Sequence, residues 1–256
     1  MHLAFYPKRI VLYVRCVLTW QKCTPSGSSN DARRLIVNVY LHVAMALVVA
    51  AVGMWINLRS FVHPDLLAFL VLLSFGLVVA LALVPRTPNT LRQRTVIYFS
   101  FAMTMGLILG PLHSHLLDSD PAIVYTAAGG AIAVFASFTA LALQSDRRWF
   151  LYAGGSLSSA LMVLLILGIS NSYFDVPFIT SLRLYGGFLL FCAYVVFDTQ
   201  VMIYEAEKGK TDPIHRATCF FLDFLGLYIR ILEFLTKLKT EEARASRPPT
   251  GYADGA

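Results

Sequence analysis

Long apolar runs separated by short charged gaps dominate the chain. Each run is close to the roughly 20 residues that a helix needs to cross about 30 Å of hydrocarbon, and none alternates as a membrane strand would. The seven runs cover residues 35–57, 65–84, 95–117, 121–143, 149–170, 182–204 and 218–238. The pattern therefore predicts an all-α fold, a polytopic membrane bundle of seven apolar helices.

The last run differs from the other six because polar side chains recur along it at every third or fourth position. Such spacing places them in one stripe along a helix whose other faces are apolar. The stripe consists of Cys219, Asp223, Gly226, Arg230, Glu233 and Lys237. A polar stripe faces protein or water rather than lipid. We therefore expect this helix at the centre of the bundle, with Gly226, Arg230 and Glu233 lining a path. An amphipathic helix lying on the membrane interface is the alternative.

The composition is typical of a membrane protein, and the limits of the apolar runs predict the domain boundaries. The 256 residues are 57% hydrophobic and 14% charged, too little charge for a soluble domain of this size. We expect one membrane domain over 35–240, after a basic amino-terminal segment (1–34) and before a polar tail (241–256). A cleaved signal peptide is disfavoured because Arg15 interrupts the only short apolar core in the first segment.

Basic residues lie mainly in alternate gaps between the runs. With a cytoplasmic amino terminus, fourteen Lys and Arg fall on the cytoplasmic side, against Arg59 and Arg183 on the other. This bias predicts that orientation. It also indicates that the basic loops, which give the net charge of +6, face anionic lipid headgroups rather than nucleic acid. The basic residues after position 236 break the pattern if the last run spans. The sequence leaves open whether that run spans, or re-enters as a half-inserted segment after six spans.

Two aspartates, Asp198 and Asp223, lie inside the last two runs. A charge at the centre of a membrane helix costs about 2.5–3.5 kcal/mol on insertion scales, so it usually has a partner and a function. Asp198 is seven residues before Glu205, and Asp223 is seven residues after Arg216. In an antiparallel hairpin, both aspartates then lie about 10 Å inside the same membrane face. The spacing predicts a facing pair of carboxyl groups.

Two carboxyl groups in contact in a low dielectric share a proton, because both cannot ionise cheaply. Such a pair is a pH-sensitive latch and a point that attracts cations, or it is a clasp between helices without transport. Paired aspartates are also the minimum for an intramembrane aspartyl protease. The sequences around them, Val-Phe-Asp198 and Phe-Leu-Asp223, lack the Tyr-Asp and Gly-x-Gly-Asp of those enzymes. We therefore expect no enzymatic activity.

Small and polar residues in the third run carry two further expectations. Gly106 and Gly110 form a small-x-x-x-small pattern that allows close helix contact, and Pro111 is expected to end the span. His113 and His115 follow among acidic residues. They are expected in a solvated loop rather than at a metal ion, because no scaffold spacing supports a metal site.

Motifs around the aspartates resemble the transmembrane BAX-inhibitor-motif family. They read Phe197-Asp198-Thr199-Gln200, Glu205-Ala206-Glu207-Lys208-Gly209 and Leu222-Asp223-Phe224, with Leu109-Gly110-Pro111 and Thr24-Pro25-Ser26 further upstream. The resemblance runs collinearly from about Thr24 to Lys239, whereas the first 23 residues do not match.

This resemblance implies a seven-helix bundle with the last helix central. It also implies a pH-dependent calcium leak across the endoplasmic reticulum membrane, with suppression of stress-induced apoptosis. Asp198 and Asp223 correspond to the family's aspartate pair, and Arg86 is the nearest candidate for its arginine latch. Calcium is then the transported ion, protons are the regulator, and no resident cofactor is expected.

A non-transporting scaffold is the competing function. It would bind anti-apoptotic Bcl-family proteins or stress-sensor kinases of the endoplasmic reticulum through the basic loops and tail. The direction of the pH effect, and the choice between channel and exchanger, do not follow from the sequence.

Overall fold

The computed structural model describes residues 30–60, 64–144, 153–174, 176–207 and 212–245. Every long element in these ranges is a helix, which confirms the all-α membrane bundle. The elements are α2 (Asn30–Ser60), α3 (Pro64–Leu83), the short 3-10 helix η2 (Pro88–Thr90), α4 (Leu91–Ser119), α5 (Pro121–Gln144), α6 (Gly154–Phe174), α7 (Pro177–Glu207) and α8 (Pro213–Ala245). The motif at Thr24, most of the basic amino-terminal segment and the end of the tail lie outside the described residues.

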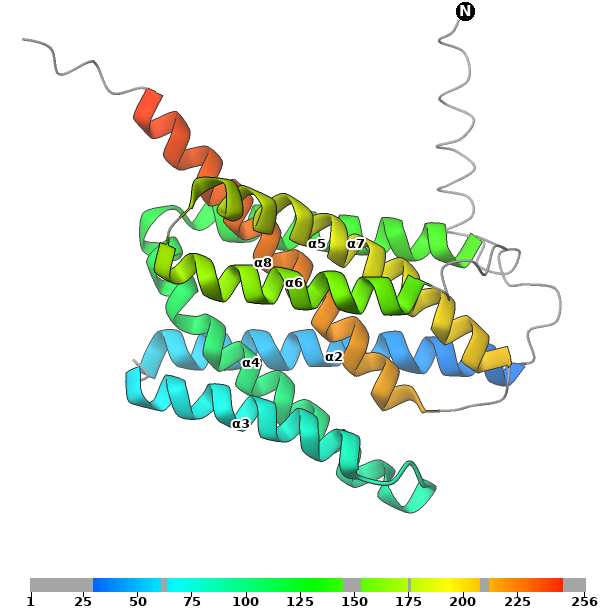
Figure 1. The fold of residues 1–256 in the computed structure, drawn as a ribbon. Coiled ribbons are helices and arrows are strands. Elements are labelled where there is room, and N and C mark those ends of the chain that lie inside the picture. The colour runs from blue at the N-terminus through cyan, green and yellow to red at the C-terminus, as the bar shows by residue number, and fades with distance from the viewer. Residues whose placement is uncertain (1–29, 61–63, 145–152, 175, 208–211, 246–256) are drawn as a thin grey trace, which may run out of the picture.

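Successive helices run up and down the bundle (Figure 1). We call the end where α2 begins, and where α3–α4 and α7–α8 are connected, the near end. The opposite end, where α4–α5 and α6–α7 are connected, is the far end. The near end is the one for which the distribution of Lys and Arg predicts a cytoplasmic location.

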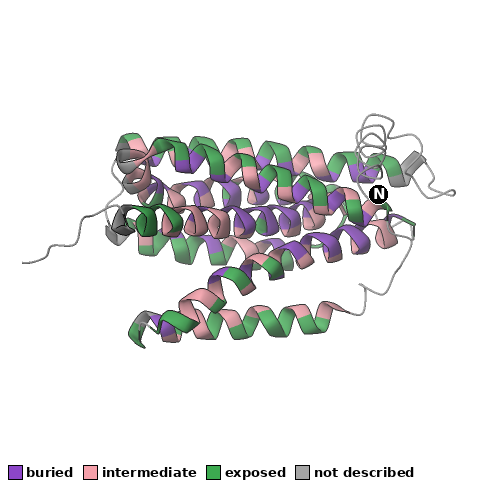
Figure 2. Cartoon of the chain, turned by 90° about the horizontal axis from the view of Figure 1, so that it is seen from above, coloured by how far each residue is buried: buried purple, intermediate pink, exposed green. Residues whose placement is uncertain are grey.

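Six helices, α2 to α7, are long and apolar enough to cross a membrane. Their outward side chains are large and apolar, including Leu72, Phe75 and Phe178, each more than 70% exposed. Buried positions gather on the inward faces, as Figure 2 shows. This inside-out distribution is what a hydrocarbon solvent requires, since lipid-facing positions gain nothing from polarity.

Helix α8 is the seventh long helix of the described residues and lies at the centre of the bundle, as the polar stripe predicts. It packs against α2, α4, α5 and α7. Its buried side chains are mostly large and apolar, among them Ile214, Phe220, Phe221, Leu227 and Leu232. The helix is amphipathic because the stripe adds polar residues, which is why α8 falls below the hydropathy of a lipid-exposed span.

Helix α8 runs the length of the bundle and does not turn back, so it has the course of a spanning rather than a re-entrant segment (Figure 1). Two contacts place its second half at the far end. Glu233 lies 3.9 Å from Arg183 near the start of α7, and Lys239 contacts Asp120 at the α4–α5 connection. The basic residues near the end of α8 therefore lie away from the other basic loops, where Asp120 and Glu241 offset part of their charge.

Pro111 does not end the third span, contrary to our prediction, because α4 continues to Ser119. Proline has no backbone N–H, so the carbonyl of Leu107 loses its helical partner. The side-chain amide of Asn57 on α2 donates to that oxygen at 2.8 Å. Gly110 permits this approach, since a methyl group there would overlap the Asn57 side chain. A tertiary hydrogen bond thus replaces the one that proline removes.

His113 is also placed differently from the predicted solvated loop. It is fully buried in α4, where Nδ1 lies 2.8 Å from the carbonyl of Leu109. A carbonyl only accepts, so Nδ1 carries a proton, and in the neutral ring Nε2 accepts from the Tyr228 hydroxyl of α8. The ring also stacks on Tyr228 with centroids 5.6 Å apart. His113 therefore joins α4 to the central helix.

Candidate functional site

Asp198 of α7 and Asp223 of α8 meet in the interior of the bundle. The two residues are 7% and 5% exposed, and their carboxyl groups lie against each other. Two carboxyl groups in such contact can hydrogen-bond to each other only when one of them carries a proton. Oδ2 of Asp223 has no hydrogen-bond partner within the described ranges. The pair therefore has spare acceptor capacity in a buried position.

Arg216 is the cation beside this pair. Its Nε and Nη2 lie 2.6 and 2.9 Å from the two carboxylate oxygens of Glu205, a bidentate arrangement. Its Nη1 lies 3.5 Å from Oδ1 of Asp198. One guanidinium thus contacts two carboxyl groups, and its hydrogen bonds go to Glu205. Two negative charges on the aspartate pair would therefore have no cation of their own.

The sequence reasoning used Arg216 only as a loop charge and missed its role in the site. The spacing contained a signal for it. Glu205 follows Asp198 by seven residues and Arg216 precedes Asp223 by seven, which is two helical turns on each helix. Each residue therefore lies on the same face as its aspartate, and the antiparallel hairpin brings all four together.

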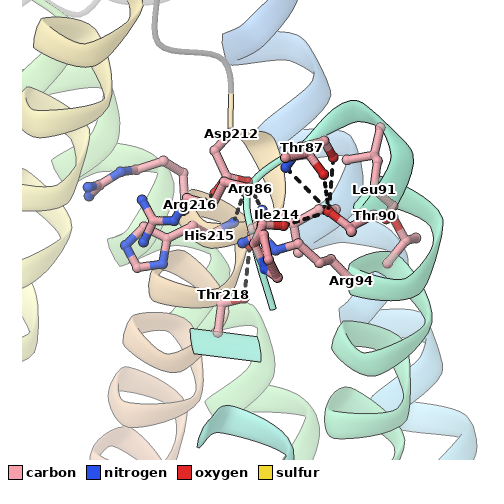
Figure 3. Close-up of polar contacts among 12 residues, drawn as sticks. Arg86, Thr87, Thr90, Leu91, Arg94, Asp212, Ile214, His215, Arg216 and Thr218 are labelled. Carbon is pink, nitrogen blue, oxygen red and sulfur yellow. Dashed lines mark hydrogen bonds and ion pairs between the residues drawn. The ribbon is translucent and has the colours of Figure 1, made fainter. Parts of the chain in front are cut away.

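A second charged cluster holds the start of α8 at the near end (Figure 3). Arg94 of α4 is 3% exposed, and its Nη1 lies 2.7 Å from Oδ1 of Asp212. Asp212 directly precedes Pro213, and its Oδ1 also accepts from the backbone N–H of His215 at 3.4 Å. An acidic cap followed by proline is a favourable helix start. Asp212 therefore both caps α8 and ties it to α4.

Arg86, the candidate for the arginine latch, lies in this second cluster. Its Nε is 3.4 Å from Oδ2 of Asp212, and its side chain is 56% exposed. The arginine that contacts the aspartate pair is Arg216, supplied by α8 itself. Figure 3 shows Arg86 and Arg94 reaching Asp212 from the α3–α4 connection and from α4.

His215 lies in the first turn of α8, before the apolar part of the helix. Burial lowers the pKa of its imidazole, and the neighbouring guanidinium groups of Arg216 and Arg86 lower it further. Both causes disfavour the charged form. The near-end cluster therefore favours the neutral form of His215.

The facing residues of α7 and α8 continue toward the far end as a series of pairs, which we call the α7–α8 seam. From the near end, the pairs are Glu205 with Arg216, Asp198 with Asp223, Phe191 with Gly226, Gly187 with Arg230, and Arg183 with Glu233. Of the three residues expected to line a path, Gly226 lies under the Phe191 ring. Arg230 and Glu233 form an ion pair at 2.7 Å.

No group of three or more His, Cys, Asp or Glu side chains arranged to hold a metal ion occurs in the parts of the chain that the structure describes. The two aspartates nevertheless offer carboxylate oxygens, the ligands preferred by hard cations such as calcium.

The fold and site define a class of protein, a polytopic helical membrane protein with a buried acidic pair on its central hairpin. The family model for "Inhibitor of apoptosis-promoting Bax1" matches residues 32–240. The chain belongs to this family, which confirms the resemblance seen in the sequence motifs.

Curated relatives agree over most of their length. The chain is 34% identical to Bax inhibitor 1 of Bos taurus, over 83% of this chain and 87% of that protein. It is 30% identical to Bax inhibitor 1 of Homo sapiens, over 90% of this chain and 95% of that protein. It is 33% identical to Bax inhibitor 1 of Arabidopsis thaliana, over 78% of this chain and 79% of that protein.

Proposed function

We propose that this protein is a pH-sensitive calcium conductance of the endoplasmic reticulum membrane, with Asp198 and Asp223 as its gate and proton sensor. The observation that carries the proposal is a buried pair of carboxyl groups in contact, one from each helix of the central hairpin. The relatives are named Bax inhibitor 1. Suppression of Bax-dependent cell death is therefore the cellular outcome that we propose for the conductance.

The shared proton would hold the hairpin closed. Removing it leaves two negative charges in contact, with one guanidinium already bound to Glu205. Two unit charges 4 Å apart repel by about 4 kcal/mol at an effective dielectric constant of about 20. The repulsion is relieved when the helices separate at this level or when a cation binds between the carboxylates. Both responses favour calcium entry, so flux should rise as pH rises.

Calcium flux into reconstituted vesicles, measured as a function of pH, tests this proposal. Wild-type protein should conduct more at alkaline than at acidic pH. The Asp198→Asn/Asp223→Asn double variant keeps the size and hydrogen-bonding capacity of the pair but cannot titrate, so its flux should be independent of pH. Glu241→Gln serves as the matched control, because Glu241 is an exposed carboxylate of the same helix. An unchanged pH profile in the double variant would refute the gate.

The scaffold function is separated from this proposal by a cell-death assay. A scaffold that binds Bcl-family proteins or stress-sensor kinases does not need a titrating pair inside the bundle. Protection that survives in the double Asn variant, after its regulated flux is lost, would therefore favour the scaffold. Protection lost together with the pH-dependent flux supports the conductance.

A further inference from the structure

Phe191 lies in the middle of the α7–α8 seam, between two groups of charges. Toward the near end, Asp198 follows it by seven residues of α7, two turns or about 10 Å along the helix axis. Toward the far end, Gly187 precedes it by four residues and is the position against which Arg230 packs. Phe191 is thus the apolar step in a series of otherwise polar or small pairs.

The ring of Phe191 rests directly on α8. Gly226 has no side chain, and a methyl group added there would overlap three ring carbons of Phe191. Tyr194, one turn closer to the aspartates, lies beside the ring with centroids 6.4 Å apart. The glycine of the polar stripe therefore serves as the seat for an aromatic side chain and does not leave an open space.

We propose that Phe191, seated on Gly226, is the barrier that closes the α7–α8 seam to hydrated cations. The inference rests on the proposed conductance and identifies a residue that controls it. A hydrated ion on the aspartate side can replace lost water only with oxygen ligands, and the ring supplies none. Hydrophobic constrictions of this kind close a path by excluding water. Ionisation of the pair opens the path only when the separating helices also lift the ring from its seat.

The charges beyond the ring explain why a barrier is needed at this level. Arg230 and Arg183 share the single carboxylate of Glu233, so this part of the seam is net positive. Asp223 and Arg230 are seven residues apart on α8, or about two helical turns, and without the ring only Gly226 of the polar stripe would lie between them. Phe191 separates the two groups and keeps the proton on the pair isolated from the far end.

Calcium flux in vesicles provides the first test. Phe191→Ala should raise flux several-fold at acidic pH, where the wild-type protein is closed. Phe191→Leu, which keeps an apolar side chain of smaller volume, should lie between the two and guards against failure of the alanine variant to fold. Phe178→Ala is the matched control, since Phe178 lies on the same helix but is 73% exposed. If the wild-type protein conducts calcium, equal flux in wild type, Phe191→Ala and Phe191→Leu would overturn the barrier.

Thiol accessibility provides a second test that does not depend on transport. Cys219 lies beside the aspartates, on the near-end side of the ring. With Cys16 and Cys23 changed to Ser and Cys192 to Ala, it is the single remaining cysteine. A small membrane-impermeant methanethiosulfonate applied from the far end should label Cys219 faster in Phe191→Ala than in the protein with Phe191.

The two tests separate failure of the barrier from failure of the conductance. Increased labelling in a protein that carries no calcium would support the barrier and refute the proposed function. A pH profile that changes in the aspartate variants, with neither flux nor labelling altered in Phe191→Ala, would support the function and refute the barrier.

Discussion

The two ends of the α7–α8 seam are built from the same pair of helices but carry opposite charge. At the near end, Asp198 and Glu205 contact one arginine, Arg216, and Asp223 lies against Asp198. At the far end, Arg183 and Arg230 face one carboxylate, Glu233. The near-end charges are also more deeply buried. The comparison indicates that the acidic end depends on each of its charges for stability, whereas the basic end lies closer to solvent or lipid headgroups.

Loss of Arg216 is expected to have the largest effect. Arg216→Gln leaves Glu205 and Asp198 without their cation in a buried setting, and breaking such a pair costs about 3–5 kcal/mol. Arg230→Gln at the far end should cost about 1 kcal/mol, because Glu233 is more exposed and keeps Arg183 nearby. Thermal unfolding of the purified protein in detergent compares the two. Equal shifts in Tm would remove the proposed difference between the ends.

Loss of the ion pair between Arg94 and Asp212 should have the next largest effect on stability. Arg94→Gln removes a buried charged hydrogen bond and should cost about 2–3 kcal/mol. Arg86→Gln should change stability by less than about 0.5 kcal/mol, because its side chain is largely exposed. Both arginines contact the same carboxylate, so each variant controls for the other. A larger loss in the Arg86 variant would show that the exposed contact, not the buried one, holds α8.

Gly187→Ala tests the contribution of the far end of the seam to stability. Its Cβ would lie 2.7 Å from Nε of Arg230, so the arginine must move. We expect a loss of about 1 kcal/mol, the lower end of the range for overpacking. Gly129→Ala, which meets nothing within 4 Å, should instead stabilise the helix by about 0.5–1 kcal/mol. Similar stability of the two variants would mean that Arg230 is not held against α7.

The smallest effect concerns His215 and pH. Its pKa is lower in the folded protein than in the unfolded chain, mainly because of burial. The unfolded state therefore binds the proton first as pH falls below about 6.5, and the folded state loses stability over that range. His215→Gln should make the stability less dependent on pH there, as measured by denaturation at neutral and mildly acidic pH. A steeper dependence in the variant would contradict the direction of the shift.

The facing aspartates follow from helix geometry and hairpin symmetry alone, which is why the sequence sufficed for them. The central position of α8 could also be predicted, since a polar stripe inside a membrane has few alternatives. Arg216 was missed because it was counted only as a loop charge that indicates membrane orientation. It lies two helical turns before Asp223 on the same face of α8, and this position brings it to Asp198.

Other features depend on contacts between distant segments and were not predictable. Pro111 lies within a continuous helix only because Asn57 supplies the missing donor from α2. His113 is buried because Tyr228 of α8 meets it across the bundle. Arg86 reaches Asp212 because the α3–α4 connection folds over the start of α8. In each case the partner lies more than fifty residues away or on a helix whose position the local pattern does not specify.

The central claim is that Asp198 and Asp223 share a proton whose release opens the seam. Infrared difference spectroscopy of wild type against the Asp198→Asn variant detects a protonated carboxyl group directly, and it can be followed over the same pH series as calcium flux. We expect the carboxylic acid band to disappear over the pH range in which flux rises. Flux that rises while the band persists, or a band absent at every pH, would contradict it.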